Sequence, residues 1–209
     1  MAVDRRLTPT TWLPALFGPG LLGILAFALS ACAGTPAGGN ANLTFTHLQP
    51  IRFNATEVQF IDNYRPTLAP PNVEHQYPQT PAAAVRDWTR ARIAAAGTAG
   101  VVRVTVVEAS VVEVRLPTRE GVGGMFFIEE NIRYDGAIEV TIDFIPRAGV
   151  TVGSPQARAR AVGTQTMLES STINQRSTIY FNLLRGMMDK LDQQLVAAVR
   201  QYMQAAVAQ

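Results

Sequence analysis

The sequence IRYDGAIEVTIDF, residues 132–144, alternates apolar and polar side chains along nearly its whole length. Successive side chains of a β-strand point to opposite faces of a sheet, so this period of two predicts one buried and one wet face. One wet face is typical of antiparallel sheets. We therefore expect residues 125–144 to form an antiparallel strand that buries Ile132, Tyr134, Ile138, Val140, Ile142 and Phe144.

Two neighbouring segments also predict strands. Residues 101–116 are rich in valine, which favours extended backbone, and Glu108 with Ser110 interrupts their alternation, so we expect a bulge there. Residues 156–168 carry small side chains on one face, which predicts that a helix crosses this strand closely. The valine strand is expected to place on one face Val102, Val104, Val106, Val112, Val114 and Leu116. The small residues are Ala157, Ala159, Ala161 and Gly163, opposite Arg158 and Arg160.

Two segments have helical periodicity. Thr80 followed by Pro81 is a favourable helix start, with threonine as the cap and proline at the first helical position. We expect this helix to run to about Ala96 and to bury Val85, Trp88, Ile93 and Ala96. Residues 174–206 predict a long second helix with one apolar side. That side is formed by Ile179, Leu183, Met187, Leu191, Leu195, Val199 and Tyr202.

The part of the chain before the first helix predicts two further strands. Residues 43–50 alternate as a strand that ends at Pro50, and residues 51–61 are apolar and β-branched. The prolines of residues 62–81 exclude regular structure there. The order β-β-α-β-β-β-α predicts an α+β fold: an antiparallel sheet of about four to five strands with two helices packed on one face. We expect residues 42–209 to form this fold as a single domain.

Residues 1–32 have the three parts of a secretion signal. Arg5 and Arg6 form a short cationic start, an apolar run follows from residue 12 to residue 29, and small residues lead to Cys32. The boundary Leu29-Ser30-Ala31-Cys32 resembles the lipobox of bacterial lipoproteins, which implies that a diacylglycerol is attached to the Cys32 sulfur and that cleavage occurs before Cys32. We expect residues 1–31 to be the signal peptide, in which Leu29, Ser30 and Ala31 are read by the processing machinery.

The lipobox also predicts where the protein resides. Residues 32–41, rich in Gly, Ala and Pro, are expected to be the lipidated cysteine and a flexible tether. Ala33 is not the aspartate that resembles an inner-membrane retention signal, so we expect the outer membrane, with the domain facing the periplasm. A transmembrane anchor is the alternative, but the apolar run of roughly 17 residues is short for a span and is interrupted by Gly and Pro.

The composition argues against several classes of function. Loss of Arg5, Arg6 and Asp4 with the signal lowers the net charge from +2 to +1, which gives no reason to expect nucleic acid. Cys32 is the only cysteine and lipidation consumes it, so the domain has no thiol nucleophile. The G-x-S-x-G pattern of serine hydrolases is absent. We expect no enzyme activity, no cofactor and no metal.

Two candidate sites have simpler structural interpretations. His75 has no neighbour at the spacing of a metal ligand, and we expect it to be a hydrogen-bonded residue that pins the proline-rich segment. Asp135, Glu139 and Asp143 lie about 13 Å apart along a strand, too far to share a proton, and are expected to be a solvated face. A possible ligand or partner face is formed by Met187 and Met188 on the last helix and by Met125 and Phe126 at a loop.

From residue 51 to residue 203 the chain resembles a family of uncharacterised alphaproteobacterial lipoproteins. The resemblance rests on Tyr64-Arg65-Pro66, on Val73-Glu74-His75 with Pro78 and Pro81, on Ile132-Arg133-Tyr134-Asp135, and on the segment from Met187 to Asp192. It departs at Gly163-Thr164-Gln165-Thr166, where a more basic stretch is expected. More loosely, the order of elements looks like that of ABC-type transport auxiliary lipoproteins. Neither resemblance implies a molecular activity.

Together these features predict a membrane-anchored periplasmic lipoprotein that acts without catalysis. We expect an adaptor or auxiliary subunit in envelope assembly or transport, with the membrane and an envelope protein as partners. The alternative is a lipid or small-ligand binding module. Its pocket would lie between the sheet and the C-terminal helix, where small residues of residues 156–168 face Met187 and Met188.

Overall fold

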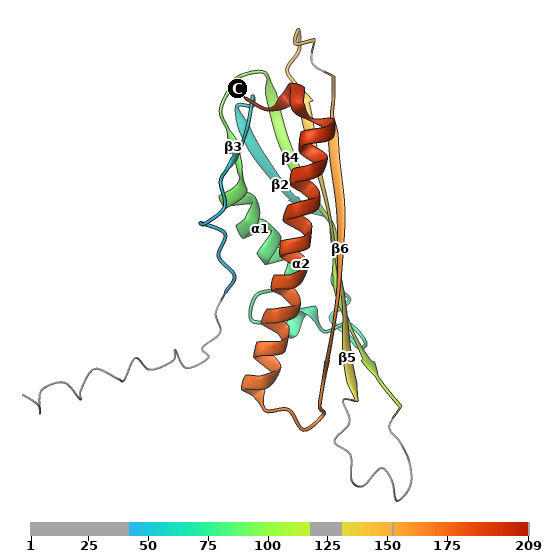
Figure 1. Ribbon diagram of the computed structural model, residues 1–209. Coiled ribbons are helices and arrows are strands. Elements are labelled where there is room, and N and C mark those ends of the chain that lie inside the picture. Colours follow the sequence, from blue (N-terminus) through green and yellow to red (C-terminus); the bar gives the residue numbers. More distant parts are fainter. Residues whose placement is uncertain (1–41, 118–130, 152, 209) are drawn as a thin grey trace, which may run out of the picture. The chain divides into compact units, whose positions relative to one another are not determined.

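The computed structural model describes residues 42–117, 131–151 and 153–208. Figure 1 shows a twisted sheet with two helices, α1 (Pro81–Arg92) and α2 (Ile173–Tyr202), on the same face. The sheet has the strand order β2 (Glu57–Asp62), β4 (Gly100–Arg115), β5 (Ile132–Pro146) and β6 (Gln156–Met167). A second, small sheet pairs β1 (Ile51–Phe53) with β3 (Ile93–Ala95). Two 3₁₀ turns, η1 (Glu74–Gln76) and η3 (Gln204–Ala206), complete the described elements.

The expected α+β fold with two helices is confirmed, and the sheet is mixed. β4, β5 and β6 are antiparallel, whereas β2 is parallel to β4. The reason is the connection: the chain leaves β2, forms α1 and β3 on one face, and only then enters β4. A parallel pair needs such a crossover, while an antiparallel pair can be joined by a short turn.

The N-terminal strands differ from the prediction. Residues 43–50 form no strand; Leu43 and Phe45 are buried in irregular backbone, and a turn follows at residues 46–47. The Leu43 backbone N–H donates to Gln79 Oε1 at 2.8 Å, so its partner is a side chain, not a neighbouring strand. Residues 51–61 divide into β1 and β2, which belong to different sheets.

The bulge predicted near Glu108 is confirmed, and it changes which side chains are buried. The pairing of β4 with β5 shifts register between Val106 and Glu108. One extra residue moves the following side chains to the opposite face. Val106 is therefore followed on the core side by Ala109 and Val111, and the expectation that Val112 and Val114 continue the buried row is wrong.

The helix starts are confirmed, and both helices end earlier than expected. Thr80 Oγ1 accepts from the Ala83 N–H at 3.2 Å, and Thr172 caps α2 together with Gln175. α1 ends at Arg92 because the next three residues form β3, which leaves Ala96 exposed. α2 ends at Tyr202, whose side chain is 59% exposed instead of buried.

The close crossing of a helix over β6 is confirmed. Gly136 of β5 and Gly163 of β6 are paired across the sheet, and the Met187 side chain of α2 lies over both. A Cβ at Gly163 would lie 2.8 Å from Leu183 Cδ1 and from Met187 Cγ. Glycine is needed here because α2 fills the space that a side chain would occupy. The row Ala157, Ala159 and Ala161 continues this contact and is buried.

Glu74 secures the proline-rich segment to β4. The segment pairs with β4 at Asn72 and Val112, beyond the part of β4 that β2 covers. The Glu74 carboxylate is 2% exposed and accepts from the Tyr64 hydroxyl at 2.7 Å and from the Val111 N–H at 3.2 Å. His75 was expected to pin this segment, but its side chain is exposed. The neighbouring glutamate has this role.

The surroundings of Glu74 favour its charged form. Burial alone would raise the pKa of the carboxyl, but hydrogen bonds from Tyr64, from the backbone and from Asn72 outweigh burial and hold the pKa below its ordinary value. The carboxylate therefore stabilises the fold above the unfolded-state pKa near 4.5. This contribution is lost as the pH falls through the lower pKa of the folded state.

The glycine contact predicts opposite effects for two Gly→Ala substitutions. Gly163→Ala should lower the free energy of unfolding by about 1–3 kcal/mol, since the new methyl group overpacks against Met187. Gly186→Ala is the matched control, because nothing lies within 4 Å of a Cβ there. It should raise the free energy of unfolding by about 0.5–1 kcal/mol through the helix propensity of alanine. Urea unfolding measures both, and equal effects would contradict the close crossing.

Glu74→Gln should lower the free energy of unfolding by about 1–3 kcal/mol at about pH 7, because an amide cannot accept all the donors that face the carboxylate. The difference from the wild-type chain should shrink as the pH falls below the unfolded-state pKa. Urea unfolding at several pH values measures this difference. The exposed Glu57→Gln serves as a control and should change stability by no more than about 0.5 kcal/mol. A pH-independent cost of Glu74→Gln would contradict the assignment.

Candidate functional site

The predicted lipidation residues lie outside the described part of the chain. These are Cys32 and the signal residues Leu29, Ser30 and Ala31. Met125 and Phe126, two members of the expected partner face, also lie outside it. The structure therefore describes the domain that the tether would carry, beginning at Asn42.

Met187 and Met188, the other two members, are both buried. Met187 fills the contact between α2 and the glycines of β5 and β6, so this part of the interface is packed with protein atoms. Met188 belongs to the core and also lines a cavity beside residues 43–48. Both side chains are almost fully buried, so neither offers an exposed surface in this structure. The expected ligand or partner face at these two residues stays a prediction.

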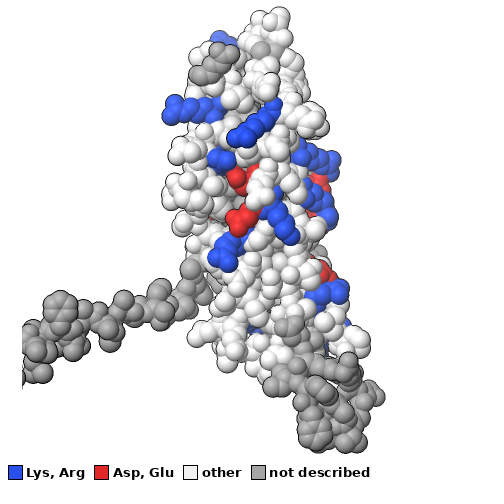
Figure 2. Space-filling view, in the orientation of Figure 1, with Lys and Arg blue, Asp and Glu red and all other residues white. Residues whose placement is uncertain are grey.

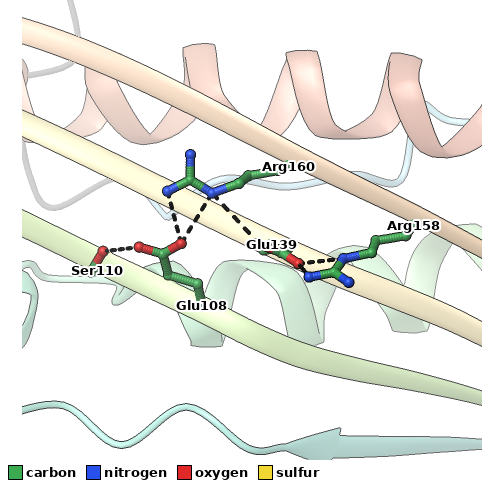
Figure 3. Close-up of polar contacts among 5 residues, drawn as sticks. All are labelled: Glu108, Ser110, Glu139, Arg158 and Arg160. Carbon is green, nitrogen blue, oxygen red and sulfur yellow. Dashed lines mark hydrogen bonds and ion pairs between the residues drawn. The ribbon is translucent and has the colours of Figure 1, made fainter.

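A network of charged side chains lies on the sheet face opposite the helices. Figure 3 shows Glu108 and Ser110 on β4, Glu139 on β5, and Arg158 and Arg160 on β6. Arg160 Nη2 lies 2.9 Å from Glu108 Oε2, and its Nε lies 3.6 Å from Glu139 Oε2. Arg158 also pairs with Glu139, and the Ser110 hydroxyl donates to Glu108 Oε1 at 2.9 Å.

The register of the strands explains why this network needs its arginines. Glu108 and Glu139 are directly opposite each other across β4 and β5, and like charges in that position repel. Arg160 is opposite Glu139 on β6 and bridges both carboxylates. Two glutamates and two arginines leave the network neutral overall.

Glu139 differs from the solvated residue that the sequence predicts. Its side chain is buried although it points away from the helices, because the guanidinium groups of Arg158 and Arg160 lie against it. The sequence contained one sign of this burial, because Arg158 and Arg160 lie two residues apart on the next strand. Asp135 and Asp143 on the same face stay half-exposed.

The exposed ends of these two arginines allow the network to donate hydrogen bonds to a partner. The side chains of Arg158 and Arg160 are 62% and 50% exposed, so part of each guanidinium fork faces solvent. A fork that is already oriented by a carboxylate can donate to a carbonyl or carboxylate of a partner with little loss of conformational freedom. Beside them on β6, Val162 is 52% exposed. We call the face formed by these residues the outer sheet face.

On the helix side, cavities lie where α2 meets the N-terminal part of the described chain. The first, of about 370 Å³, lies between α2 and β1, and the second, of about 350 Å³, lies between α2 and residues 43–48. Arg92 lines the first cavity and Asp192 lines the second, and the two side chains form an ion pair at 2.9 Å. The Trp88 Nε1–H also donates to Asp192 Oδ1 at 2.9 Å. Figure 2 shows basic and acidic side chains close together in the middle of this side.

No family model matches the chain, and no curated protein matches it. The resemblance to alphaproteobacterial lipoproteins therefore stays a prediction. Within residues 42–117, 131–151 and 153–208, no cluster of three or more His, Cys, Asp or Glu side chains could hold a metal ion. No helix in that part of the chain has the length and apolar character to cross a membrane.

The like-charge contact predicts that the effect of Glu108→Gln reverses sign with its background. In the wild-type chain this substitution removes a carboxylate paired with Arg160 and should lower the free energy of unfolding by about 0.5–1 kcal/mol. In an Arg160→Gln chain Glu108 has lost its arginine and still faces Glu139, which keeps only Arg158, so the substitution removes a like-charge contact and should raise that free energy by up to a similar amount. Urea unfolding of the four chains measures this. Additive effects would show that Arg160 does not bridge the two carboxylates.

Proposed function

We propose that this chain is a lipoprotein of the bacterial cell envelope that works as a non-enzymatic adaptor or auxiliary subunit in envelope assembly or transport. The observation that carries the proposal is the sequence Leu29-Ser30-Ala31-Cys32, which ends an apolar run and is followed by a segment rich in Gly, Ala and Pro. The described fold starts directly after that segment, with Leu43 in the core.

The lipid anchor and the length of the tether limit how far from the membrane the domain could reach. Two or more acyl chains on Cys32 would hold the chain stably in a membrane, whereas one would bind only marginally. The residues from 32 to 41 could span at most about 35 Å when fully extended. A partner of the domain would then be a protein of the same membrane or one that approaches its surface. We place the protein at the outer membrane, facing the periplasm, because Ala33 follows the cysteine.

We further propose that the adaptor contacts an envelope protein through the outer sheet face. In the described part of the chain both helices cover the opposite face, so this one is open to solvent. Its oriented arginines and the exposed Val162 combine charged donors with an apolar contact. Interfaces between non-obligate partners have this mixed composition, with arginine enriched.

Cys32→Ser should abolish membrane anchoring. The sulfur is the nucleophile that accepts the lipid, and cleavage depends on that modification, so the unprocessed precursor should accumulate. In Triton X-114 partitioning, the wild-type chain should enter the detergent phase. A Cys32→Ser chain that is still cut to mature size and still enters the detergent phase would contradict the lipoprotein proposal.

A photo-crosslinking amino acid at Val162 in living cells should capture an envelope protein. The same amino acid at Gln194, which is exposed on α2, is the matched control and should capture that protein much less. Recovery of only export and sorting machinery at both positions would count against an adaptor. Equal capture of one partner at both positions would move the contact away from the outer sheet face.

A further inference from the structure

The cavity between α2 and β1 combines apolar walls with two arginines. Its volume of about 370 Å³ lies within the range of small-ligand sites, which are mostly apolar with a few placed polar groups. The apolar walls come from Pro50 and Ile51 on one side and from Val196 and Val199 of α2 on the other. Arg92 and Arg200 are the charged residues that line it.

The two arginines differ in how their charges are balanced. Arg92 is largely buried, and its guanidinium pairs with Asp192 and donates to the Gln49 carbonyl. Arg200 is exposed, and within the described residues no carboxylate forms an ion pair with it. Among the described residues, the rim of the cavity therefore carries one guanidinium that no carboxylate pairs with.

The position of Arg200 means that its charge determines whether the rim of the cavity attracts or repels an anion. It lies in the last turn of α2, where the helix dipole presents its negative end. That end is equivalent to roughly half a negative charge, so it offsets part of the Arg200 charge and would repel an anion if Arg200 were absent. The full positive charge of the guanidinium exceeds it, so the rim attracts an anion. A guanidinium also offers paired donors that match the two oxygens of a carboxylate.

We propose that this cavity binds a single-chain amphiphile with an anionic head, such as a fatty acid. The apolar walls take the chain, and Arg200 takes the carboxylate at the rim. The site is distinct from the pocket expected between the sheet and α2, because it lies on another flank of the helix. The inference concerns the domain alone and does not depend on a lipid at Cys32.

The test uses the chain from Gly38 to Gln209, which forms a compact unit and contains the whole described core. Cooperative thermal unfolding by circular dichroism first verifies that each variant is folded. Trp88 is the only tryptophan of this chain and is joined to the cavity wall through Asp192 and Arg92, so its fluorescence reports on occupancy. Decanoate is the probe, decanol is its uncharged counterpart, and acetate is its head alone. Calorimetric titration measures each affinity.

Decanoate should bind at one site, and decanol and acetate should bind at least about tenfold more weakly. Arg200→Gln should weaken decanoate binding about tenfold, while Arg200→Lys should retain part of the affinity because it keeps the charge. Val196→Trp should abolish binding by filling the cavity. Arg185→Gln, on the same helix beside the other cavity, should leave the affinity unchanged.

Three outcomes would overturn the proposal. The first is no saturable binding of decanoate to the folded wild-type chain. The second is equal affinity for decanoate and decanol, which would remove the role of the anion. The third is unchanged affinity in the folded Arg200→Gln and Val196→Trp chains, which would place decanoate elsewhere on the molecule.

Discussion

The contact of α2 with two facing glycines sets the distance between the helix layer and the sheet. Gly136 and Gly163 leave room for Met187, so α2 lies directly on β5 and β6. Five residues further along α2, Asp192 accepts hydrogen bonds from Trp88 and Arg92 and so fixes α1 beside it. Because both helices are held on one face, charged residues could accumulate on the other. The two cavities described above follow from the same placement, since they lie where the helix meets residues 43–51 and not the four-stranded sheet.

The edges of the sheet show a second constraint. β2 covers the first half of β4, and the proline-rich segment continues the pairing along its second half, where Glu74 binds the Val111 N–H. The unpaired backbone groups of an edge strand can form hydrogen bonds with a strand of another chain and so favour aggregation. The other edge, β6, carries Arg158 and Arg160 and is contacted by Lys190, whose ammonium donates to the Val162 carbonyl. Charges along an edge strand disfavour further pairing.

Sequence reasoning succeeded where one physical requirement dominated. Strict alternation located β5, Thr80 with Pro81 located the start of α1, and the small residues of β6 located the close helix crossing. The sequence-based predictions were wrong where contacts between distant segments decide which conformation a residue adopts. The face of Val112 depends on one bulged residue, and β3 takes Ile93 from the helix because β1 lies beside it. The burial of Glu139 depends on Arg158 and Arg160 of the next strand, whose spacing was visible in the sequence but whose pairing with Glu139 was not. The cavity at Arg200 is lined by residues far apart in the chain, so no local pattern predicts it.

Lipid on Cys32 is proposed to hold this domain at a membrane, and the mass of the mature protein is the most direct measure of that attachment. Intact mass spectrometry of protein extracted from its own membrane, followed by sequencing of its N-terminal peptide, gives the answer in one preparation. We expect a chain that begins at Cys32 and carries a diacylglycerol on its sulfur. A chain that retains residues 1–31, or a mature chain with an unmodified Cys32, would contradict it.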